Sequence, residues 1–543
     1  MGTPELPVPD GLVLRPFRGV RFAVEDPAKV TSPPYDLISD TDVDALLDLH
    51  PNNVVRLILP RSPHPEASTK SPRAERQTPA TPSDTHPLTQ VPPEPPASAS
   101  TPAQEGIVPG AHPAAATPEP AEVPFASRYA EARSTLRAWL DAGVLVPDDV
   151  PALYVYEQSG PSVLQRGLIG DVGLADPGQR IILPHEDVMP GPIADRLALM
   201  STTQANLEPI FLLYDGDHGT TTALVDEVAA KRRPLVSAHT EDGLTHRLWA
   251  ITDEEEIAAI NADLHARQAL IADGHHRYAT YRVLQRQEHV TREILPTTKT
   301  RSHPPATSTP PSPIPPTSEP SPPQPGVPQT AQSPHATEPK PTSPPHPTAS
   351  NEPTVGPWDF GLALLVDSTA YPPDLKAIHR VIPGLRLAEA TAKAKGSWQV
   401  RDYDNLAEGL TALENAPEPA FLLAGEDGSH LMTNPDPVQL AQAMPADHSD
   451  RWNSLNTSIL AAFVLPKVWG MRDDDQTVRI VHHDTEAALQ LAIRTGGTAV
   501  ILKPLAVDNV LAVAASGERV PRKSTSFGPK PRTGLVLRTF AID

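Results

Sequence analysis

The pattern of apolar and polar positions divides much of the chain into short strands and amphipathic helices. Apolar runs bounded by turn residues predict strands, and these runs are residues 152–156, 167–170, 209–214, 245–251 and 360–366. Apolar residues that recur every three or four positions predict helices at 129–140 and 254–268. Strands that alternate with helices are typical of α/β and α+β folds. We therefore expect an α/β (α+β) fold with a mixed-sheet core.

Residues 269–278 combine three predicted features. An apolar run predicts a buried strand, Asp273-Gly274 predicts a tight turn, and helical spacing begins at His275. The first turn of a helix has free backbone N–H groups and a partial positive charge, so it favours an anion, especially phosphate. Arg277 opposes the helix dipole unless another group compensates for it. A plainer interpretation is that Asp273 caps the helix and the histidines are solvated, and the segment alone leaves both open.

Other elements are predicted from shorter signals. Residues 53–59 are expected to form a buried strand and 534–537 a last strand. Pro190 and Pro192 interrupt the helical spacing that follows His185, so a helix is expected to begin at Asp195. The C-terminal portion mixes predicted helices and strands; the helices are 388–394, 405–415, 457–463 and 485–494, and the strands are 419–423, 478–482 and 498–503.

Proline is concentrated in two segments. Of 68 prolines, 15 lie within residues 63–122 and 20 within 295–356, among Ser, Thr, Ala, Gln and Glu. Such segments bury too little apolar surface to offset chain entropy, so both are predicted to be disordered insertions. About 420 residues remain to fold, which is enough for two or three packed domains. The predicted parts are a core segment (1–62), an insertion (63–122), a core segment with the 269–278 stretch (123–294), an insertion (295–356) and a C-terminal α/β part (357–543).

Charge and composition exclude several classes of protein. The net charge of −21 argues against a protein that coats nucleic acid, because that mode of binding needs a basic surface. The absence of cysteine excludes thiol catalysis, disulfides and thiolate metal sites. The first residues lack a signal-peptide pattern and no run approaches 18 apolar residues, so a cytoplasmic protein with no membrane segment is expected.

Several short clusters carry polar side chains suited to a functional site. Arg18 lies among three arginines around Pro16, which can clamp an anion or line a solvated rim. The prolines before Tyr35 and Asp36 hold both residues in a rigid turn. The remaining clusters are His185-Glu186, Asp195-Arg196, His379-Arg380, and Lys523-Ser524-Thr525 with Lys530. The last of these can close over a phosphate or remain a solvated basic loop.

The order of these motifs resembles that of a bacterial and archaeal family, domain-of-unknown-function family 1015, whose members are sometimes labelled partition-protein-like. The resemblance covers the chain apart from the two insertions. It is carried by Ser32-Pro33-Pro34-Tyr35-Asp36, His185-Glu186 with Asp195-Arg196-Leu197, Pro209 to Tyr214, Asp273-Gly274-His275-His276-Arg277-Tyr278, His379-Arg380, and Lys523-Ser524-Thr525 with Pro529-Lys530 and Gly534-Leu535-Val536.

The Asp-Gly-His-His-Arg segment is in turn similar to the phosphate-binding motif of the ParB and sulfiredoxin superfamily. That similarity implies a ParB/sulfiredoxin-like phosphate-binding unit and three candidate activities. Sulfiredoxin chemistry needs a reactive cysteine, which this chain lacks. Partition proteins carry a basic helix-turn-helix domain, which neither the sequence nor the net charge supports, so nucleic acid is not expected as a partner. Free-serine kinases that make O-phosphoserine remain.

On this hypothesis the chain binds ATP or ADP with Mg²⁺ and a small hydroxyl substrate such as free serine. The predicted phosphate cradle is Asp273, Gly274, His275, His276 and Arg277. Glu186 is the first candidate for the base and Asp36 the second, with His185 catalytic or holding the substrate, and Asp195 is a candidate metal ligand. The predicted substrate-binding residues are Arg18, Tyr35, Arg196, His379, Arg380, Lys523, Ser524, Thr525 and Lys530.

Two alternatives stay open at this point. One is a metal-dependent hydrolase that uses His185, Glu186, His275 and His276, although adjacent histidines on a helix point about 100° apart and cannot easily share one metal. The other is a non-catalytic nucleotide- or nucleic-acid-binding regulatory module of the ParB-like type. Neither a Walker-type loop nor a G-x-G-x-x-G fingerprint is present, so the standard nucleotide-binding folds are not expected.

Overall fold

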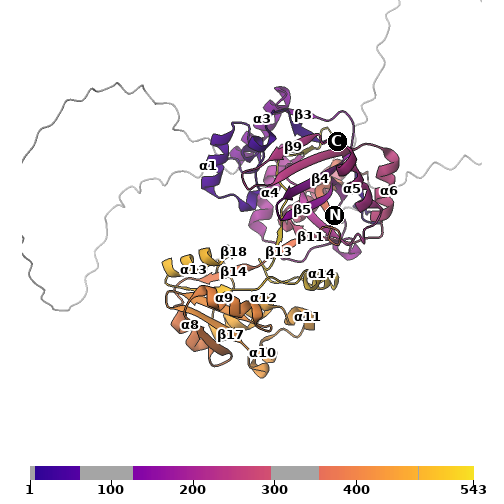
Figure 1. Ribbon diagram of the computed structural model, residues 1–543. Coiled ribbons are helices and arrows are strands. Elements are labelled where there is room, and N and C mark those ends of the chain that lie inside the picture. The colour runs from indigo at the N-terminus through magenta and orange to yellow at the C-terminus, as the bar shows by residue number, and fades with distance from the viewer. Residues whose placement is uncertain (1–5, 62–125, 295–353, 475, 543) are drawn as a thin grey trace, which may run out of the picture.

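The computed structural model describes residues 6–61, 126–294, 354–474 and 476–542 (Figure 1). The predicted disorder of 63–122 and of nearly all of 295–356 concerns residues outside these ranges. Two lobes make up the described part, each built on its own sheet. The prediction of a mixed α/β fold is confirmed.

The larger lobe contains a nine-stranded mixed sheet. Its strand order is β6 (Ile182–Leu183), β11 (Ala269–Asp273), β8 (Ile210–Tyr214), β12 (Phe360–Asp367), β5 (Val163–Gly173), β4 (Leu153–Gly160), β10 (Thr245–Ile251) and β9 (Val236–His239), with β1 (Leu14–Arg15) paired to β5. The β11–β6 and β12–β8 pairs are parallel and the others are antiparallel. The predicted hairpin of 152–156 with 167–170 is confirmed as β4 and β5.

Both faces of this sheet are buried, which explains its continuous apolar strands. Alternate residues of each strand point to opposite cores; in β8, for example, Leu212 lies in one core and Leu213 in the other. The helices α5 (Thr220–Lys231), α6 (Glu254–Leu264) and α7 (His275–Ile294) contribute to the first core. The second core is completed by α14 (Val507–Ala515) and by the chain that follows it.

The remaining elements of the larger lobe pack around its edges. They include two small antiparallel pairs, β2 (Val20–Phe22) with β3 (Leu145–Pro147), and β7 (Ala205–Asn206) with β21 (Arg538–Thr539). The helices α1 (Asp40–Leu49), α2 (Val55–Ile58), α3 (Ala126–Asp141) and α4 (Pro190–Thr203) also belong to this lobe. Its short turns are η1 (Pro27–Val30), η2 (Tyr35–Leu37), η3 (Pro177–Gln179) and η4 (Pro357–Asp359).

The smaller lobe contains a six-stranded antiparallel sheet. Its order is β15 (Gln399–Tyr403), β17 (Gly428–Thr433), β16 (Phe421–Gly425), β19 (Thr498–Ile501), β14 (Ile378–Ile382) and β18 (Arg479–His482). Its helices are α8 (Leu387–Ala394), α9 (Leu406–Asn415), α10 (Pro437–Ala443), α11 (Asp450–Asn453), α12 (Asn456–Ile459) with the π-helix η5 (Leu460–Val468), and α13 (Thr485–Arg494).

The chain enters the smaller lobe after β12 and returns to the larger lobe near its end. The strand β13 (Asp374–Lys376) on the outward path pairs with β20 (Ser526–Gly528) on the return path. This two-stranded link lies between the lobes (Figure 1). It brings residues 520–530 next to residues from the first half of the chain.

Three predicted elements are wrong. Residues 53–59 contain the short helix α2 instead of a strand, because a short apolar run does not distinguish a buried strand from a buried helical turn. Residues 534–537 form a turn and an isolated bridge, and the last strand, β21, begins at Arg538. Helix α4 begins at Pro190, because proline is tolerated in the first turn, where its missing N–H costs no hydrogen bond.

The prediction of no membrane segment can be compared only with the described residues. Among their helices, none combines the length and the apolar character that crossing a membrane would require.

Candidate functional site

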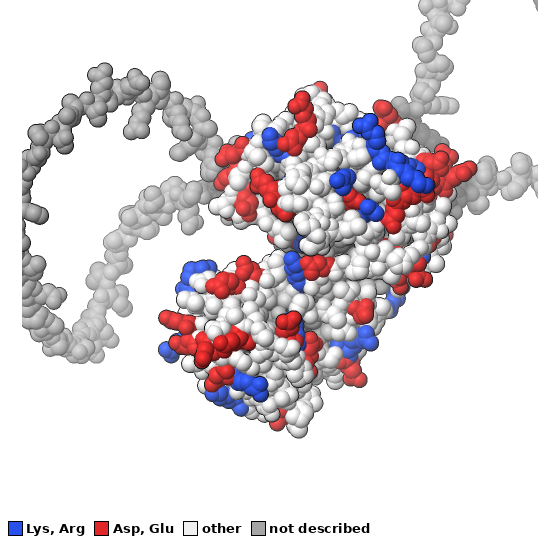
Figure 2. Space-filling view, viewed as in Figure 1, with Lys and Arg blue, Asp and Glu red and all other residues white. Residues whose placement is uncertain are grey.

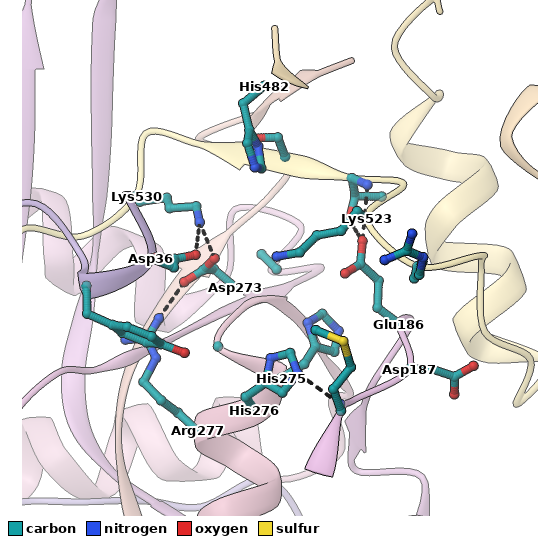
Figure 3. Close-up of a pocket in the computed structure, with 17 residues that line it drawn as sticks. Asp36, Glu186, Asp187, Asp273, His275, His276, Arg277, His482, Lys523 and Lys530 are labelled. Atoms are coloured by element: carbon teal, nitrogen blue, oxygen red, sulfur yellow. Dashed lines mark hydrogen bonds and ion pairs between the residues drawn. The ribbon is translucent and has the colours of Figure 1, made fainter. Parts of the chain in front are cut away.

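A pocket lies where β11 ends and α7 begins (Figure 3). One wall comes from the larger lobe, through η2, the β11–α7 turn and residues 186–189. The other wall comes from the end of β18 and from the returning chain at 522–530. The lining residues are Tyr35, Asp36, Glu186, Asp187, Met189, Ala272, Asp273, Gly274, His275, His276, Arg277, His482, Arg522, Lys523, Thr525, Ser526 and Lys530.

The turn between β11 and α7 is built around Gly274. Its φ of +93° lies in the left-handed region that favours glycine, and a Cβ there would lie 2.9 Å from Cγ2 of Ile210. The N–H of Tyr278 donates to the carbonyl of Gly274, and no hydrogen bond is described from the N–H groups of residues 275–277. The predicted strand, turn and helix are therefore confirmed, and α7 begins at the pocket with free N–H groups.

Four alternating charges lie side by side at one end of the pocket (Figure 3). Arg277 Nη2 lies 2.5 Å from Asp273 Oδ2, and Lys530 Nζ lies 2.5 Å from Asp273 Oδ1 and 2.8 Å from Asp36 Oδ2. Arg277 also donates to the carbonyl of Pro209 at 2.6 Å. The guanidinium of Arg277 is therefore held by Asp273, which compensates for the cation in the first turn of the helix.

Ion pairing shifts the pKa values of groups in this cluster. Burial disfavours the charged form of Asp36, but the charges of Lys530 and Arg277 outweigh burial and hold the pKa of Asp36 below its ordinary value. Burial likewise opposes the charge of Lys530, but the carboxylates of Asp273 and Asp36 raise the pKa of Lys530 above its ordinary value. Asp36, Lys530 and Arg277 are therefore charged at neutral pH.

Glu186 accepts three hydrogen bonds from one loop. Its Oε1 accepts from the N–H of Ser524 at 3.2 Å, the N–H of Thr525 at 3.1 Å and the hydroxyl of Thr525 at 2.7 Å. The segment that carries Glu186 is fixed to the same region, because the N–H of Val520 donates to the carbonyl of His185. The carboxylate of Glu186 borders the pocket (Figure 3).

His185 lies behind this contact instead of lining the pocket. Its Nε2 lies 2.7 Å from Oγ1 of Thr525, and its backbone N–H donates to Nε2 of His275. The two rings meet edge to face with centroids 4.5 Å apart. Burial lowers the pKa of both imidazoles, so both are neutral at pH 7. His185 is therefore placed to hold Thr525.

Two further imidazoles line the pocket. His276 Nε2 accepts the N–H of Met189 at 3.0 Å, and burial together with the charge of Lys523 lowers the pKa of His276. His482 approaches from the smaller lobe, and burial lowers its pKa to about 4. Because Nε2 of both His275 and His276 accepts a backbone N–H, these two atoms are not free to bind one metal.

The pocket can hold an anion beside a carboxylate. The start of α7 and the ammonium of Lys523 favour phosphate groups, and Glu186 can accept a proton or orient a hydroxyl. The described residues contain no group of three or more His, Cys, Asp or Glu that could hold a metal ion. Mg²⁺ usually takes one or two carboxylates together with substrate phosphates, and the carboxylates that line the pocket are Asp36, Glu186, Asp187 and Asp273.

A family model covers much of the chain that forms this pocket. The model described as "Protein of unknown function (DUF1015)" matches residues 14–79 and 111–305. Over these residues the chain matches the DUF1015 family. No curated protein matches it.

Solved structures show a distant likeness to this chain. A free serine kinase in complex with AMP has 12% identity and a TM-score of 0.28, with 64% of this chain and 84% of that chain covered. C-terminally truncated SbnI from Staphylococcus aureus has 9% identity and a TM-score of 0.28 over 66% and 82%. A conserved hypothetical protein from Pyrococcus furiosus has 11% identity and a TM-score of 0.28 over 68% and 93%.

Three residues predicted for the site lie outside the pocket and contact other residues. Arg18 Nε donates to the carbonyl of Asp148 at 2.9 Å. Asp195, the candidate metal ligand, instead pairs with Arg196 and Arg128 at 2.5 Å each. Arg196 stacks over the ring of Tyr35 with its guanidinium carbon 4.4 Å from the centroid, so it supports the pocket wall from behind.

Three others are buried and do not line the pocket. The ring of His379 accepts the N–H of Leu502. Arg380 donates to the carbonyls of Arg522 and Lys523 at 3.0 and 2.9 Å. Ser524 donates its hydroxyl to Pro521 and does not line the pocket. The other predicted binding residues, Tyr35, Lys523, Thr525 and Lys530, do line it.

Sequence reasoning missed several residues at or beside the pocket. His482 and Arg522 line it. His482 lies in no motif with a recognisable spacing, whereas Arg522 directly precedes the predicted Lys523-Ser524-Thr525 cluster. Glu208 is buried behind the pocket, where its Oε1 accepts the N–H of Tyr35 at 3.0 Å and the hydroxyl of Thr533 at 3.2 Å. Burial raises the pKa of Glu208. An acidic residue directly before a buried strand was the available signal for Glu208.

Proposed function

We propose that this protein is a nucleotide-dependent phosphotransferase that acts on a small hydroxyl substrate such as free serine. The observation that supports this best is the presence, in one pocket, of an anion-binding surface and a carboxylate. The start of α7 and Lys523 provide the anion-binding surface, and Glu186 provides the carboxylate. Phosphoryl transfer requires phosphates that are held, charge that is neutralised and an acceptor hydroxyl aligned with a base.

In this proposal the donor phosphates lie against the N–H groups at the start of α7, and Lys523 neutralises their charge. Mg²⁺ would supply further charge neutralisation between the phosphates and a carboxylate. The acceptor hydroxyl oxygen bonds to phosphorus as the bond to the nucleotide breaks, and its proton passes to Glu186. ATP would leave as ADP, and ADP would leave as AMP.

Glu186 is preferred to Asp36 as the base on the described contacts. Asp36 is held by Lys530, and its lowered pKa makes it a weaker proton acceptor. Glu186 has neutral hydrogen-bond donors around Oε1, and no hydrogen bond is described to Oε2. Asp36 then serves to place Lys530.

The test is transfer of labelled phosphate from ATP or ADP, with Mg²⁺, to serine, threonine and homoserine. We expect transfer by the wild-type protein and a loss of kcat of about 10²- to 10⁴-fold in Glu186→Gln, because general-base catalysis contributes about that much. Asp187→Asn is the matched control, since Asp187 pairs with the exposed Arg519 and points away from the pocket centre (Figure 3).

The outcomes separate the candidate functions. Full activity in Glu186→Gln would remove Glu186 as the base. Nucleotide binding with no transfer to any acceptor would favour a non-catalytic nucleotide-binding module. No nucleotide binding at all would contradict both.

A further inference from the structure

The loop that holds Glu186 has the geometry of an anion-binding site. Lys523 is in the left-handed conformation, with φ of +52°. The next two N–H groups, of Ser524 and Thr525, converge on one oxygen, and the hydroxyl of Thr525 joins them. Successive N–H groups that converge after such a residue form a concave nest that binds anions. Here the anion is an internal one, the carboxylate of Glu186.

A buried cation lies behind the same loop. Arg380 is only 2% exposed, and its guanidinium donates to the carbonyls of Ile378, Arg522 and Lys523. These bonds hold the carbonyl groups on the buried side of the loop. The described ion pairs include none for Arg380, so its charge has no paired carboxylate.

The charges around the loop do not cancel. Among the described residues, Lys523 also has no ion pair, and Figure 3 shows its side chain extending into the pocket. Arg522 is paired with Asp473 at 2.9 Å. The nearby carboxylates Asp473 and Asp36 are already paired, with Arg522 and Lys530 respectively. Glu186 is therefore the carboxylate left to offset the unpaired charges of Lys523 and Arg380. An anion with more than one charge would balance this loop better than Glu186 does.

We propose that the 523–525 loop is a binding site for a phosphate group and that Glu186 occupies it as an internal substitute until phosphate displaces it. A phosphate oxygen would take the three donors that now bind Oε1 of Glu186, and Lys523 and Arg380 would supply the positive charge. The displaced carboxylate would turn into the pocket. The site belongs to the pocket of the proposed function, but phosphate binding here does not depend on catalysis.

The proposal predicts that one substitution strengthens phosphate binding. If Glu186 competes with phosphate, Glu186→Gln should bind phosphate more tightly than the wild-type protein does, because a neutral amide holds the loop less strongly and does not repel the anion. If the loop serves only to hold Glu186, the same substitution should leave phosphate affinity unchanged or lower it.

The experiment is calorimetric titration of the full-length protein with inorganic phosphate and, separately, with ADP. We expect Glu186→Gln to lower the Kd for phosphate by roughly tenfold and Lys523→Ala to raise it by roughly tenfold, each about the value of one charge-assisted hydrogen bond. Asp187→Asn removes the same charge one residue away without touching the loop, and its Kd should change by less than about threefold if displacement matters more than long-range charge.

Equal Kd values for the wild-type protein and Glu186→Gln would overturn the proposal, and so would an equal gain in Asp187→Asn. Tighter binding of both phosphate and ADP assigns the loop to a nucleotide phosphate, and a gain for phosphate alone assigns it to a free phosphate group. A thermal shift on adding phosphate, larger in Glu186→Gln than in the wild-type protein, checks the same claim on folded protein. Because no acceptor or turnover is involved, a failure here is distinct from a failure of the phosphotransferase proposal.

Discussion

Lys530 contacts a carboxylate that lies 494 residues away in sequence. Its ammonium contacts Asp36 from the N-terminal part of the chain and Asp273 at the end of β11. Asp273 in turn holds Arg277 in the first turn of α7. Each charge in the set has an opposite charge beside it, which is the condition under which buried charges are tolerated. At the scale of residues, these paired charges fix one end of the pocket.

The ionised state of Asp36 predicts a pH-dependent stability. Its folded pKa is below the unfolded value of about 3.9, so its contribution is fully present above about pH 4 and is lost as pH falls through the folded pKa. We expect Asp36→Asn to lower the free energy of unfolding by about 1–2 kcal/mol at pH 7. The difference from the wild-type protein should shrink below about pH 4.

Denaturant unfolding at pH 7 and pH 3 measures this difference. The exposed Asp149→Asn serves as the control for removing a carboxylate with no described partner, and it should be close to neutral. A deficit in Asp36→Asn that is the same at both pH values would contradict the ion pair with Lys530.

At the scale of elements, the turn from β11 to α7 carries the most information. Its backbone conformation requires Gly274, and its close packing against Ile210 leaves no room for a side chain. The position of the free N–H groups of α7 depends on this turn. Replacement of Gly274 by alanine, which adds one methyl group, therefore tests the importance of this turn.

Gly274→Ala should destabilise the protein by about 2–3 kcal/mol, because it combines backbone strain at positive φ with a clash in a packed site. Gly143→Ala is the matched control: its φ is +70° but nothing lies within 4 Å of the added Cβ. We expect the control to cost only the strain, about 1 kcal/mol. Urea unfolding measures both, and equal losses would show that Ile210 does not constrain the turn.

The sequence predicted elements best where period and turn residues agree. The pair β4 and β5, strand β10 and the β11–α7 turn all have such agreement. The short helix α2 was missed because its apolar run is equally consistent with a strand. The predicted start of α4, at Asp195, is too late because proline suits the first turn of a helix, and α4 begins at Pro190.

The residues of the pocket were harder to predict than its central turn. Lys523, Thr525 and Glu186 could be named as candidates from their motifs, but nothing in sequence spacing indicates that Thr525 donates to Glu186. Arg380 was predicted to bind substrate, and only the fold shows that it lies beneath the loop. Contacts between residues that are hundreds of positions apart in sequence depend on the path of the chain between the lobes. Local sequence patterns do not encode that path.

At the scale of the whole molecule, the pocket is assembled from both lobes. The larger lobe supplies Asp36, Glu186 and the β11–α7 turn, whereas the smaller lobe supplies His482. Acidic and basic side chains are interspersed over the face of the molecule shown in Figure 2. On a protein with a net charge of −21, the positive groups of the pocket would, in the proposed function, provide a local site for an anion. A small phosphate-bearing ligand suits this arrangement better than a nucleic acid does.

The most direct measurement is titration of the wild-type protein with ADP and Mg²⁺ by calorimetry, alongside Lys523→Ala. We predict one site per chain with a Kd in the micromolar to millimolar range, weakened roughly tenfold in the variant because one charge-assisted contact is lost. The absence of measurable heat with the wild-type protein, or an unchanged Kd in Lys523→Ala, would contradict the claim that this pocket binds nucleotide phosphates.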